Sequence, residues 1–295
     1  MKHYISIDIG GTAIKYGVLA EDGSFLSRGE TPTEAARGGP AILEKVTGIA
    51  ARLWETAAIS GICISTAGMV DPERGEVFYS APLIPHYAGT NFKKTMEARF
   101  GVPCEVENDV NCAGLAESVS GAGQGSRSMV MLTIGTGIGG CIVLDGKVLH
   151  GAGNSACEVG YLHMRGSDFQ TLGAASILTE KVAAQKGEPE SVWNGLRIFE
   201  AAKRGDPVCS AAIDEMVGVL GEGIANICYV IDPEVVVLGG GVMAQEEYLR
   251  GPLEAALREY LLDSVADHVR LAFARHRNDA GMLGAFYHFM QRQRG

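Results

Sequence analysis

Alternating apolar and polar positions open the chain and predict three consecutive strands. The run from Tyr4 reads YISIDI and is followed by GGT, by AIKYGVLA, by the pair Asp22-Gly23 and by SFLSRG. An Asp-Gly pair between two such runs is the signal of a tight hairpin, and a glycine turn separates the first two runs. The sequence therefore predicts a meander of strand, glycine turn, strand, hairpin turn and strand.

The same order of elements returns in the second half of the chain. MVMLTI begins at Met129 and is followed by GTGIGG, CIVL, the pair Asp145-Gly146 and KVLHG. After each meander comes a helical pattern of apolar residues, at Ala41 to Ala57 and at Ala211 to Tyr229, and then a buried strand that ends in a glycine turn. We interpret the two halves as an internal duplication.

Shorter signals predict how the halves are divided. VPCEVEN from Val102 predicts a strand, Asp109 begins a helix, and Gly121 to Gly125 is the predicted domain boundary. The pattern of Ala280 to Arg292 predicts a helix that packs back across the N-terminal half. We expect an α/β protein of two domains, residues 1–120 completed by the helix 280–295 and residues 121–279, with a central cleft in which the glycine turns hold a ligand.

Composition excludes several classes of function. The 295 residues include 25 Lys plus Arg against 35 Asp plus Glu, a net charge of −10 without a basic tract, so nucleic acid is not an expected partner. Asp8 interrupts the first apolar run, and the longest uncharged stretch, Ser128 to Leu144, contains four glycines, so neither a signal peptide nor a membrane span is expected. The seven scattered cysteines form no Cys-x-x-Cys pair, which favours a reduced, cytoplasmic protein.

The glycines of the two meander turns have a chemical interpretation. Gly135 to Gly140 match G-x-G-x-x-G, but the strand-like run CIVL follows instead of the helix that a dinucleotide site requires. DIGGT and IGTGIGG each offer backbone N–H groups without bulky side chains, and such groups form concave anion sites. Two of these turns suit a triphosphate, whereas either turn alone is better explained by a tight hairpin.

Acidic residues stand at the ends of predicted strands. Asp8 interrupts an apolar strand, where a carboxylate is costly unless it is paired, so we expect it to hold Mg²⁺ through water. Asn108 or Asp109 could simply cap the helix that follows; alternatively Asp109 is a base for a hydroxyl nucleophile and Asn108 binds a substrate hydroxyl. Glu158 lies in the glycine-rich stretch GAGNSACEVGYLHM, which favours a ligand-binding acid.

Six motifs together carry a resemblance to a known family. They are DIGGT at Asp8, STAGMVD at Ser65, ENDVNCAGLAE at Glu107, IGTGIGG at Ile134, ACEVGY at Ala156 and VVLGGGV at Val236. In this order and spacing they resemble the ROK family of sugar kinases and sugar-responsive repressors, and the resemblance covers nearly the whole chain. That family belongs to the actin-like (ribonuclease H-like) ATPase superfamily of duplicated domains, in agreement with the internal repeat.

The resemblance implies roles for individual residues. Asp109 is similar to the catalytic base, Asn108 and Glu158 to ligands of sugar hydroxyls, and Gly68 to a residue that lines the sugar site. The implied ATP-binding residues are Asp8, Gly10, Gly11, Thr12 and Lys15 in the first phosphate turn, Gly135, Thr136 and Gly137 in the second, and Gly239 and Gly240 beside the adenosine.

Two departures from the family pattern concern zinc and the sugar site. Tyr161 stands where many members have a histidine, and the stretch RGSDFQTLGAASILTEK from Arg165 has none of the cysteines of their zinc loop. Cys157 and His163 alone cannot build a tetrahedral site, so no structural zinc is expected. Whether His163 binds the sugar in place of the missing histidine stays open. The stretches FQTLGAASIL and GTNF are more similar to β-glucoside kinases and related zinc-free members.

The resemblance implies ATP- and Mg²⁺-dependent transfer of a phosphoryl group to the 6-hydroxyl of a hexose or β-glucoside. One alternative is a non-catalytic, sugar-sensing ROK regulator, which would need an N-terminal DNA-binding domain for which the strand at Tyr4 leaves no room. Another is an actin-like kinase for a different small hydroxylated substrate. The sequence leaves open which sugar is used and whether the chain is a monomer or a homodimer.

Overall fold

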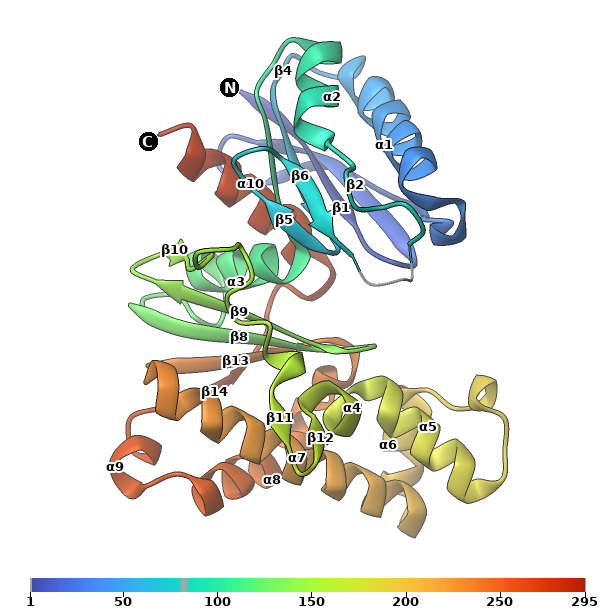
Figure 1. Cartoon of the computed structure of the whole chain (residues 1–295), viewed down its shortest axis with the longest axis vertical. Coiled ribbons are helices and arrows are strands. Elements are labelled where there is room, and N and C mark those ends of the chain that lie inside the picture. Colours follow the sequence, from blue (N-terminus) through green and yellow to red (C-terminus); the bar gives the residue numbers. More distant parts are fainter. Residues whose placement is uncertain (1, 81–83, 295) are drawn as a thin grey trace. The chain divides into compact units, whose positions relative to one another are not determined.

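The computed structural model describes residues 2–80 and 84–294, and the chain divides into two compact units (Figure 1). Unit 1 comprises Met1–Val119, His150–Ala156 and Asn278–Gly295, and unit 2 comprises Ser120–Leu149 and Cys157–Arg277. His150–Ala156, which the sequence assigned to the second domain, belongs to unit 1. The chain therefore leaves unit 2 for seven residues and returns to it directly before Glu158.

Unit 1 is built on a five-stranded sheet with the order β3-β2-β1-β4-β7. β2 and β3 continue β1 as an antiparallel meander, and β4 and β7 are parallel to β1. The strands of unit 1 are β1 (His3–Ile9), β2 (Ala13–Ala20), β3 (Phe25–Pro32), β4 (Ile59–Thr66), β7 (Cys104–Asn108) and the separate pair β5 (Met69–Asp71) and β6 (Glu76–Tyr79). The helices are η1 (Ala35–Arg37), α1 (Gly38–Trp54), α2 (Phe92–Phe100), α3 (Asp109–Ser120) and α10 (Ala280–Arg292).

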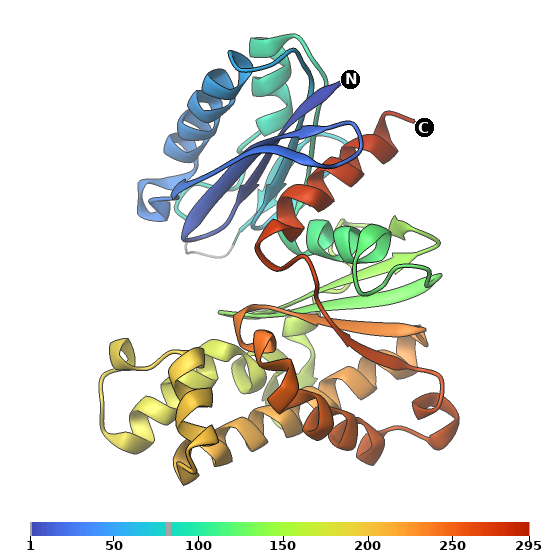
Figure 2. The same cartoon turned by 180° about the vertical axis from the view of Figure 1, so that it is seen from behind.

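The alternation along β1 explains the layers of unit 1. Ile5, Ile7 and Ile9 are fully buried in a core that includes residues of α1 and α2. The intervening positions face α10, where Ser6 Oγ donates a hydrogen bond to the carbonyl oxygen of Met282 at 2.8 Å. The sheet thus has α1 and α2 on one face and α10 on the other (Figures 1 and 2).

Two glycines let α10 approach its neighbours closely. A Cβ atom at Gly284 would overlap the backbone of Cys112 in α3, and a Cβ atom at Gly281 would overlap the carboxyl group of Asp8. The helix predicted over residues 280–292 is confirmed, and these glycines explain how it can lie directly against the end of β1.

Unit 2 repeats the sheet of unit 1. Its strand order is β10-β9-β8-β13-β14, with β9 and β10 antiparallel and β13 and β14 parallel in the same positions as their counterparts. The strands are β8 (Ser128–Ile134), β9 (Ile138–Leu144), β10 (Lys147–Val148), β13 (Val235–Gly239), β14 (Arg270–Phe273) and the separate pair β11 (His163–Met164) and β12 (Ser167–Asp168). The duplicated α/β fold predicted from the sequence is therefore confirmed.

The helices of unit 2 form one core with its sheet. Fully buried Leu220 and Ile224 of α7 belong to the same core as Val130 and Leu132 of β8. The helices are η2 (Val159–Tyr161), α4 (Phe169–Gly173), α5 (Ala175–Lys186), η3 (Glu190–Val192), α6 (Gly195–Lys203), α7 (Pro207–Ile231), η4 (Gly241–Gln245), α8 (Glu246–Tyr260) and α9 (Asp263–Ala266), and η5 (Arg277–Asp279) spans the boundary with unit 1. Among the described residues, no helix combines the length and the apolar character that a membrane span requires.

Candidate active site

Asp8 lies near the end of β1, where its sheet partners are Lys15 on β2 and Ser65 on β4. Ser65 Oγ donates a hydrogen bond to Asp8 Oδ1 at 2.7 Å. Burial raises the pKa of the Asp8 carboxyl, and the Ser65 hydrogen bond and the charge of Lys15 oppose that shift without cancelling it. A cation beside Asp8 would favour its ionised form, and one carboxylate with waters and substrate phosphates is an ordinary ligand set for Mg²⁺. Asp8 therefore fits the predicted role.

The turn after β1 presents its residues to solvent. The amide of Gly10 donates to the carbonyl oxygen of Ala13 at 3.0 Å and closes the turn, while Gly11 and Thr12 are exposed. A Cβ atom at Gly11 would meet nothing within 4 Å, so the protein itself does not require glycine there. Lys15 Nζ donates to Asn278 Oδ1 at 3.3 Å. The predicted phosphate turn of unit 1 is thus an open loop beside a buried acid.

Asn108 and Asp109 lie where β7 ends and α3 begins, and they have different roles in the helix. Asn108 Oδ1 accepts hydrogen bonds from the amides of Val110 at 2.9 Å and Asn111 at 3.0 Å, so Asn108 is the cap. Its Nδ2 donates to Gly68 O at 2.8 Å and to Asp109 Oδ1 at 3.0 Å. The structure therefore brings three predicted sugar-site residues together, and it assigns the cap to Asn108 rather than Asp109.

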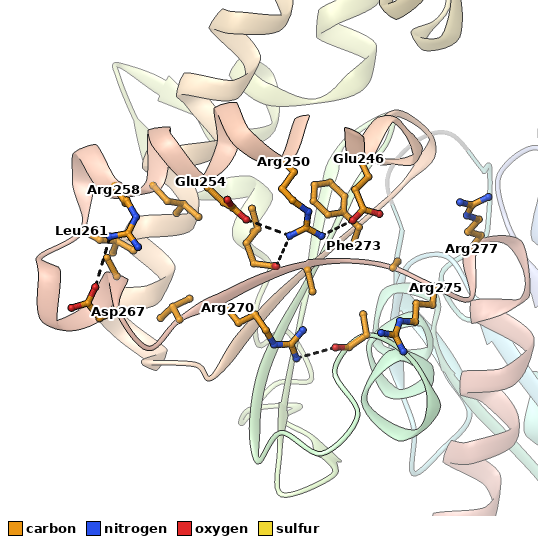
Figure 3. Close-up of a pocket in the computed structure, with 17 residues that line it drawn as sticks. Glu246, Arg250, Glu254, Arg258, Leu261, Asp267, Arg270, Phe273, Arg275 and Arg277 are labelled. Carbon is orange, nitrogen blue, oxygen red and sulfur yellow. Dashed lines mark hydrogen bonds and ion pairs between the residues drawn. The ribbon is translucent and has the colours of Figure 1, made fainter. Parts of the chain in front are cut away.

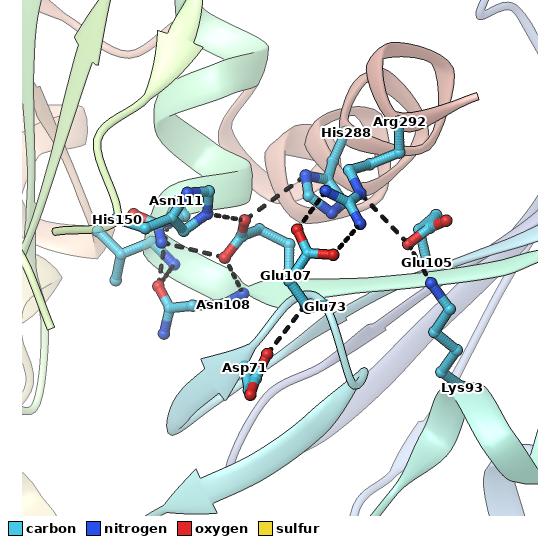
Figure 4. A network of polar contacts seen from close by, with 11 residues as sticks. Asp71, Glu73, Lys93, Glu105, Glu107, Asn108, Asn111, His150, His288 and Arg292 are labelled. Atoms are coloured by element: carbon cyan, nitrogen blue, oxygen red, sulfur yellow. Dashed lines mark hydrogen bonds and ion pairs between the residues drawn. The ribbon is translucent and has the colours of Figure 1, made fainter. Parts of the chain in front are cut away.

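Glu107 lies directly behind this pair and is completely buried. Its Oε1 accepts hydrogen bonds from the amide of Asn108 at 2.8 Å and from Asn111 Nδ2 at 3.0 Å. Its Oε2 lies 2.6 Å from His150 Nε2 (Figure 4). The backbone that carries Asn108 and Asp109 is thus tied to the segment His150–Ala156 through one carboxylate.

The polar network continues into α10. His288 Nδ1 lies 3.5 Å from Glu107 Oε2, and His288 Nε2 is buried without a hydrogen-bond partner among the described residues. Arg292 binds Glu73 through two hydrogen bonds of 2.6 and 2.7 Å and lies 3.7 Å from Glu105 Oε2 (Figure 4). The contacts with Glu105 and Glu107 join α10 to β7, which directly precedes Asp109.

The titration of this network follows from burial and pairing. Burial alone would raise the pKa of Glu107, but the hydrogen bond from His150 and the charges of both histidines shift it below its usual value. The hydrogen bond to Glu107 raises the pKa of His150, and burial lowers the pKa of His288. These shifts favour an ionised Glu107 paired with a protonated His150, and burial disfavours the protonated form of His288.

In unit 2 the two predicted glycine turns line one cavity. A hollow of about 400 Å³ is lined by Ile134, Gly135, Ala175, Asn194, Gly195, Leu196, Gly241 and Val242. Gly135 belongs to the turn between β8 and β9, and Gly241 directly follows the predicted pair Gly239 and Gly240. The sequence indicated both turns but not Ala175 or Asn194–Leu196, because these lie at the starts of α5 and α6, outside the six motifs.

The turn of residues 135–137 is held by the start of α5. Gly135 O accepts a hydrogen bond from the amide of Ala175 at 2.9 Å, and Thr136 O accepts one from Ser176 Oγ at 2.6 Å. These bonds hold the turn through its carbonyl oxygens and do not use the Thr136 side chain. Thr136 is exposed. A Cβ atom at Gly135 would meet nothing within 4 Å. The Gly135 amide closes the turn by donating to Gly137 O at 2.9 Å, so a ligand would meet the Thr136 hydroxyl and the amides that follow Gly135.

Glu158 and His163 occupy neighbouring but separate elements of unit 2. Glu158 immediately precedes η2, and Cys157 before it has a φ of 66°, a left-handed conformation that costs roughly 1–2 kcal/mol for a residue with a side chain. Desolvation raises the pKa of the Glu158 carboxyl although the residue as a whole is exposed. His163 lies in β11 opposite Asp168, and no hydrogen bond joins it to Glu158 among the described residues.

The described residues contain no group of three or more His, Cys, Asp or Glu side chains arranged to hold a metal ion. All seven cysteines are free thiols; Cys157 is half-buried, and burial raises its pKa to about 12. A thiol of this kind is a poor metal ligand, because a zinc ligand must be the thiolate. The absence of structural zinc stays a prediction that metal analysis can test.

Comparison with known proteins identifies the family. The family model described as "ROK family" matches residues 4–292 of this chain. A β-glucoside kinase of Klebsiella pneumoniae is 34% identical over 295 residues, which cover 97% of this chain and 95% of that protein. The chain belongs to the ROK family, and the resemblance carried by the six motifs is confirmed.

Solved structures agree with this membership. A ROK hexokinase from Thermus thermophilus has 31% sequence identity and a TM-score of 0.85, with coverage of 99% of this chain and 100% of that chain. A ROK family glucokinase from Streptomyces griseus, solved in complex with glucose and AMPPNP, has 28% identity and a TM-score of 0.83, with coverage of 96% and 97%. The fold is accordingly the actin-like fold of ROK sugar kinases.

Proposed function

We propose that the protein is an ATP-dependent sugar kinase that transfers the γ-phosphoryl group to the 6-hydroxyl of a hexose or β-glucoside. Family membership and the kinase names of the relatives support this class of activity. The observation that carries this proposal is the position of Asn108 and Asp109, where β7 ends and α3 begins. Asn108 caps α3 and donates to Gly68 O, and Asp109 follows it as the first residue of α3, where we assign it the role of the base.

In the proposed reaction, Asn108, Glu158 and His163 bind sugar hydroxyls, and Gly68 lines the same site. Asp109 accepts the proton of the 6-hydroxyl as its oxygen forms a bond to the γ-phosphorus of ATP. The bond between that phosphorus and the bridging oxygen of the β-phosphate breaks, and ADP leaves with its electron pair. Catalysis of this kind depends mainly on positioning and on neutralisation of phosphate charge.

The phosphates are assigned to backbone amides and small hydroxyls. Residues 10–12 with Lys15 form the turn of unit 1, Gly135, Thr136 and Gly137 form the turn of unit 2, and Gly239 and Gly240 lie beside the adenosine. The 400 Å³ hollow at Gly135 and Gly241 supports the adenosine assignment, because it is concave and mainly apolar with a few polar groups. When bound, Mg²⁺ held by Asp8 through water supplies neutralisation of phosphate charge.

Within the family, β-glucoside kinases are the favoured model. The relative from Klebsiella pneumoniae carries that name, and the stretches FQTLGAASIL and GTNF point to the same group. The alternatives are a non-catalytic ROK regulator and a kinase for another small hydroxylated substrate. A regulator would not need a base. Here the buried carboxylate of Glu107 holds the amide of Asn108, whose side chain donates a hydrogen bond to Asp109.

A cytoplasmic location follows from the same proposal, because ATP and the sugar substrates of such kinases are intracellular and the seven cysteines are free. Size-exclusion chromatography with light scattering would decide between a monomer and a homodimer.

The decisive experiment is an ADP-coupled assay across glucose, other hexoses, N-acetylhexosamines and β-glucosides such as cellobiose. The proposal predicts Mg²⁺-dependent turnover with at least one of them, and ³¹P NMR of the product should show a phosphomonoester on carbon 6. Binding of sugar without turnover of any substrate would favour the regulator. Phosphorylation at another hydroxyl would overturn the assigned position but leave the kinase class intact.

A further inference from the structure

Glu107 is a completely buried carboxylate to which the proposed reaction gives no role. An ionised carboxylate in a protein interior is costly unless it is paired, and well-packed apolar residues are often no less stabilising than a buried ion pair. The helix cap does not require Glu107, because Asn108 Oδ1 already accepts the amides of Val110 and Asn111. Packing and capping therefore do not explain why a charged residue stands at position 107.

The pair that Glu107 forms with His150 differs from the ion pairs at the surface of unit 2. In the groove between α8 and β14, Arg250 contacts Glu246 and Glu254, and each of these side chains is at least 40% exposed (Figure 3). Exposed pairs of this kind contribute little, since water can replace either partner. Only 1% of the Glu107 side chain is exposed, so a lost partner leaves a charge that water does not reach. The geometry of the buried pair is therefore the more strictly maintained.

The two carboxylate oxygens of Glu107 bind different segments of unit 1. Oε1 accepts hydrogen bonds from the Asn108 amide at 2.8 Å and from Asn111 Nδ2 at 3.0 Å, where α3 begins. Oε2 lies 2.6 Å from Nε2 of His150, which is 43 residues further along the chain (Figure 4). The orientation of one carboxylate group therefore sets the position of these two segments relative to each other.

His150 begins a loop that closes on itself. The amide of Ala156 donates to the carbonyl oxygen of His150 at 3.1 Å, so the two ends of the loop lie together. Ser155 Oγ lies 3.8 Å from the Sδ atom of Met69, which begins β5. The loop thus contacts unit 1 at both ends, through Glu107 and through Met69, and the position of His150 determines that of Ala156.

We propose that Glu107 and His150 are positioning residues for the sugar site. Glu107 positions the backbone of Asn108, and His150 positions the loop that ends at Ala156, two residues before Glu158. This assignment rests on the proposed function, in which Asn108 and Glu158 bind sugar hydroxyls. One ion pair then orients the segments that carry both ligands, and neither of its members contacts the sugar or the phosphates.

The charges that face His150 come from three elements. Glu107 lies on β7, Arg292 and His288 on α10, and Glu73 in the turn between β5 and β6 (Figure 4). The hydrogen bond to Glu107 raises the pKa of His150, and burial and the charge of Arg292 oppose this shift without cancelling it. The charged pair therefore persists at about pH 6 and is lost as the pH rises through the folded-state pKa, which lies above about 6.5. Sugar affinity should fall over the same range.

Calorimetric titration of the full chain with glucose, N-acetylglucosamine and cellobiose tests this assignment. His150→Gln keeps a side-chain N–H that can donate to Glu107, but it cannot carry the charge. At about pH 6 the variant should bind the tightest of these sugars at least about fivefold more weakly than wild type does. Toward about pH 9 the difference should shrink, because wild type then loses the charged pair as well. A variant that is only less stable would show fewer binding sites at unchanged affinity.

Two controls separate a positioning role from a general one. His268→Gln removes a histidine of unit 2 whose Nε2 lies 2.7 Å from Asp232 Oδ1 and whose pKa is raised by that contact. Its sugar affinity should match that of wild type at each pH. Mg²⁺-AMPPNP, titrated without sugar, should bind His150→Gln as it binds wild type, because the nucleotide is assigned to other turns.

The outcomes distinguish this assignment from the proposed function. The positioning role is overturned if His150→Gln and wild type bind sugar equally at about pH 6, or if their difference stays constant as the pH rises. It is also overturned if the variant loses sugar and nucleotide affinity to the same extent, and in each of these cases the pair only stabilises unit 1. If wild type binds none of the three sugars, the proposed function fails and the positioning role fails with it.

Discussion

The two sheets have the same topology but carry opposite chemistry at equivalent positions. Asp8 on β1 pairs with Lys15 and with Ser65, whereas the equivalent Thr133 on β8 pairs with Gly139 and with Gly239. In unit 1 the strand ends present an acid, a base and a hydroxyl. In unit 2 they present one threonine and two glycines, without an acid.

This difference shows how a duplicated scaffold can separate two tasks. Side chains are needed where a proton or a cation is handled, and they are costly there unless partners hold them. Backbone amides suffice where phosphate oxygens are bound, and glycine allows the close approach. We therefore assign acid-base chemistry to unit 1 and most nucleotide contacts to unit 2, and the following predictions test that division.

The largest expected effect is on turnover in Asp109→Asn. The substitution keeps the shape but removes the proton acceptor, so kcat should fall by at least about 10²-fold, as for other lost general bases. Because Asn108 provides the cap, the melting temperature should change little. Steady-state kinetics and thermal unfolding measure both quantities, and near-normal kcat in the folded variant would remove Asp109 from the mechanism.

The second effect concerns the pair of Glu107 and His150. His150→Gln leaves a buried carboxylate without its charged partner, which costs about 3 kcal/mol where such pairs are broken. The pKa of His150 is raised in the folded state, so its contribution to stability is complete below the unfolded-state pKa of about 6.5 and is lost as the pH rises through the folded-state pKa.

Chemical denaturation of wild type and His150→Gln between about pH 6 and pH 9 measures this contribution. The stability difference between the two proteins should shrink as the pH rises. Asp232 also raises the pKa of His268. Because both proteins contain His268, its contribution cancels in the stability difference. A constant difference over this range would show that the pair does not titrate as described.

The sequence predicted the meanders, the glycine turns and the four helices α1, α3, α7 and α10, because each depends on local pattern. It could not predict that His150 belongs to unit 1, since that placement depends on a contact with Glu107 far away in the chain. It also left the cap open between Asn108 and Asp109, which only hydrogen-bond geometry could decide. The glycine count was similarly ambiguous, because glycines needed for packing and glycines available to ligands look alike in sequence.

A matched pair of glycines separates these two uses. Gly240 has a φ of 103°, and a Cβ there would overlap the backbone of Ile134, whereas a Cβ at Gly241 would meet nothing within 4 Å. Gly240→Ala should therefore lose on the order of 1–3 kcal/mol of stability. Gly241→Ala should unfold like wild type. Equal denaturation midpoints for the two variants would show that the Gly240 turn is not constrained as described.

The smallest expected effect is that of zinc removal. The purified protein should contain no stoichiometric zinc by elemental analysis, and chelator treatment followed by added Mg²⁺ should restore full activity, because Cys157 and His163 cannot complete a tetrahedral site. Stoichiometric zinc together with unfolding on its removal would contradict this prediction.

The division of tasks is tested most directly by paired calorimetric titrations of Asp109→Asn and Gly135→Ala with the preferred sugar and with Mg²⁺-AMPPNP. A Cβ at Gly135 meets no protein atom within 4 Å, so any lost affinity reports the close approach of a ligand. The account predicts that Asp109→Asn binds both ligands nearly as wild type does, and that Gly135→Ala binds the sugar normally but the nucleotide at least about tenfold more weakly. Normal nucleotide affinity in Gly135→Ala, or loss of nucleotide affinity in Asp109→Asn instead, would contradict it.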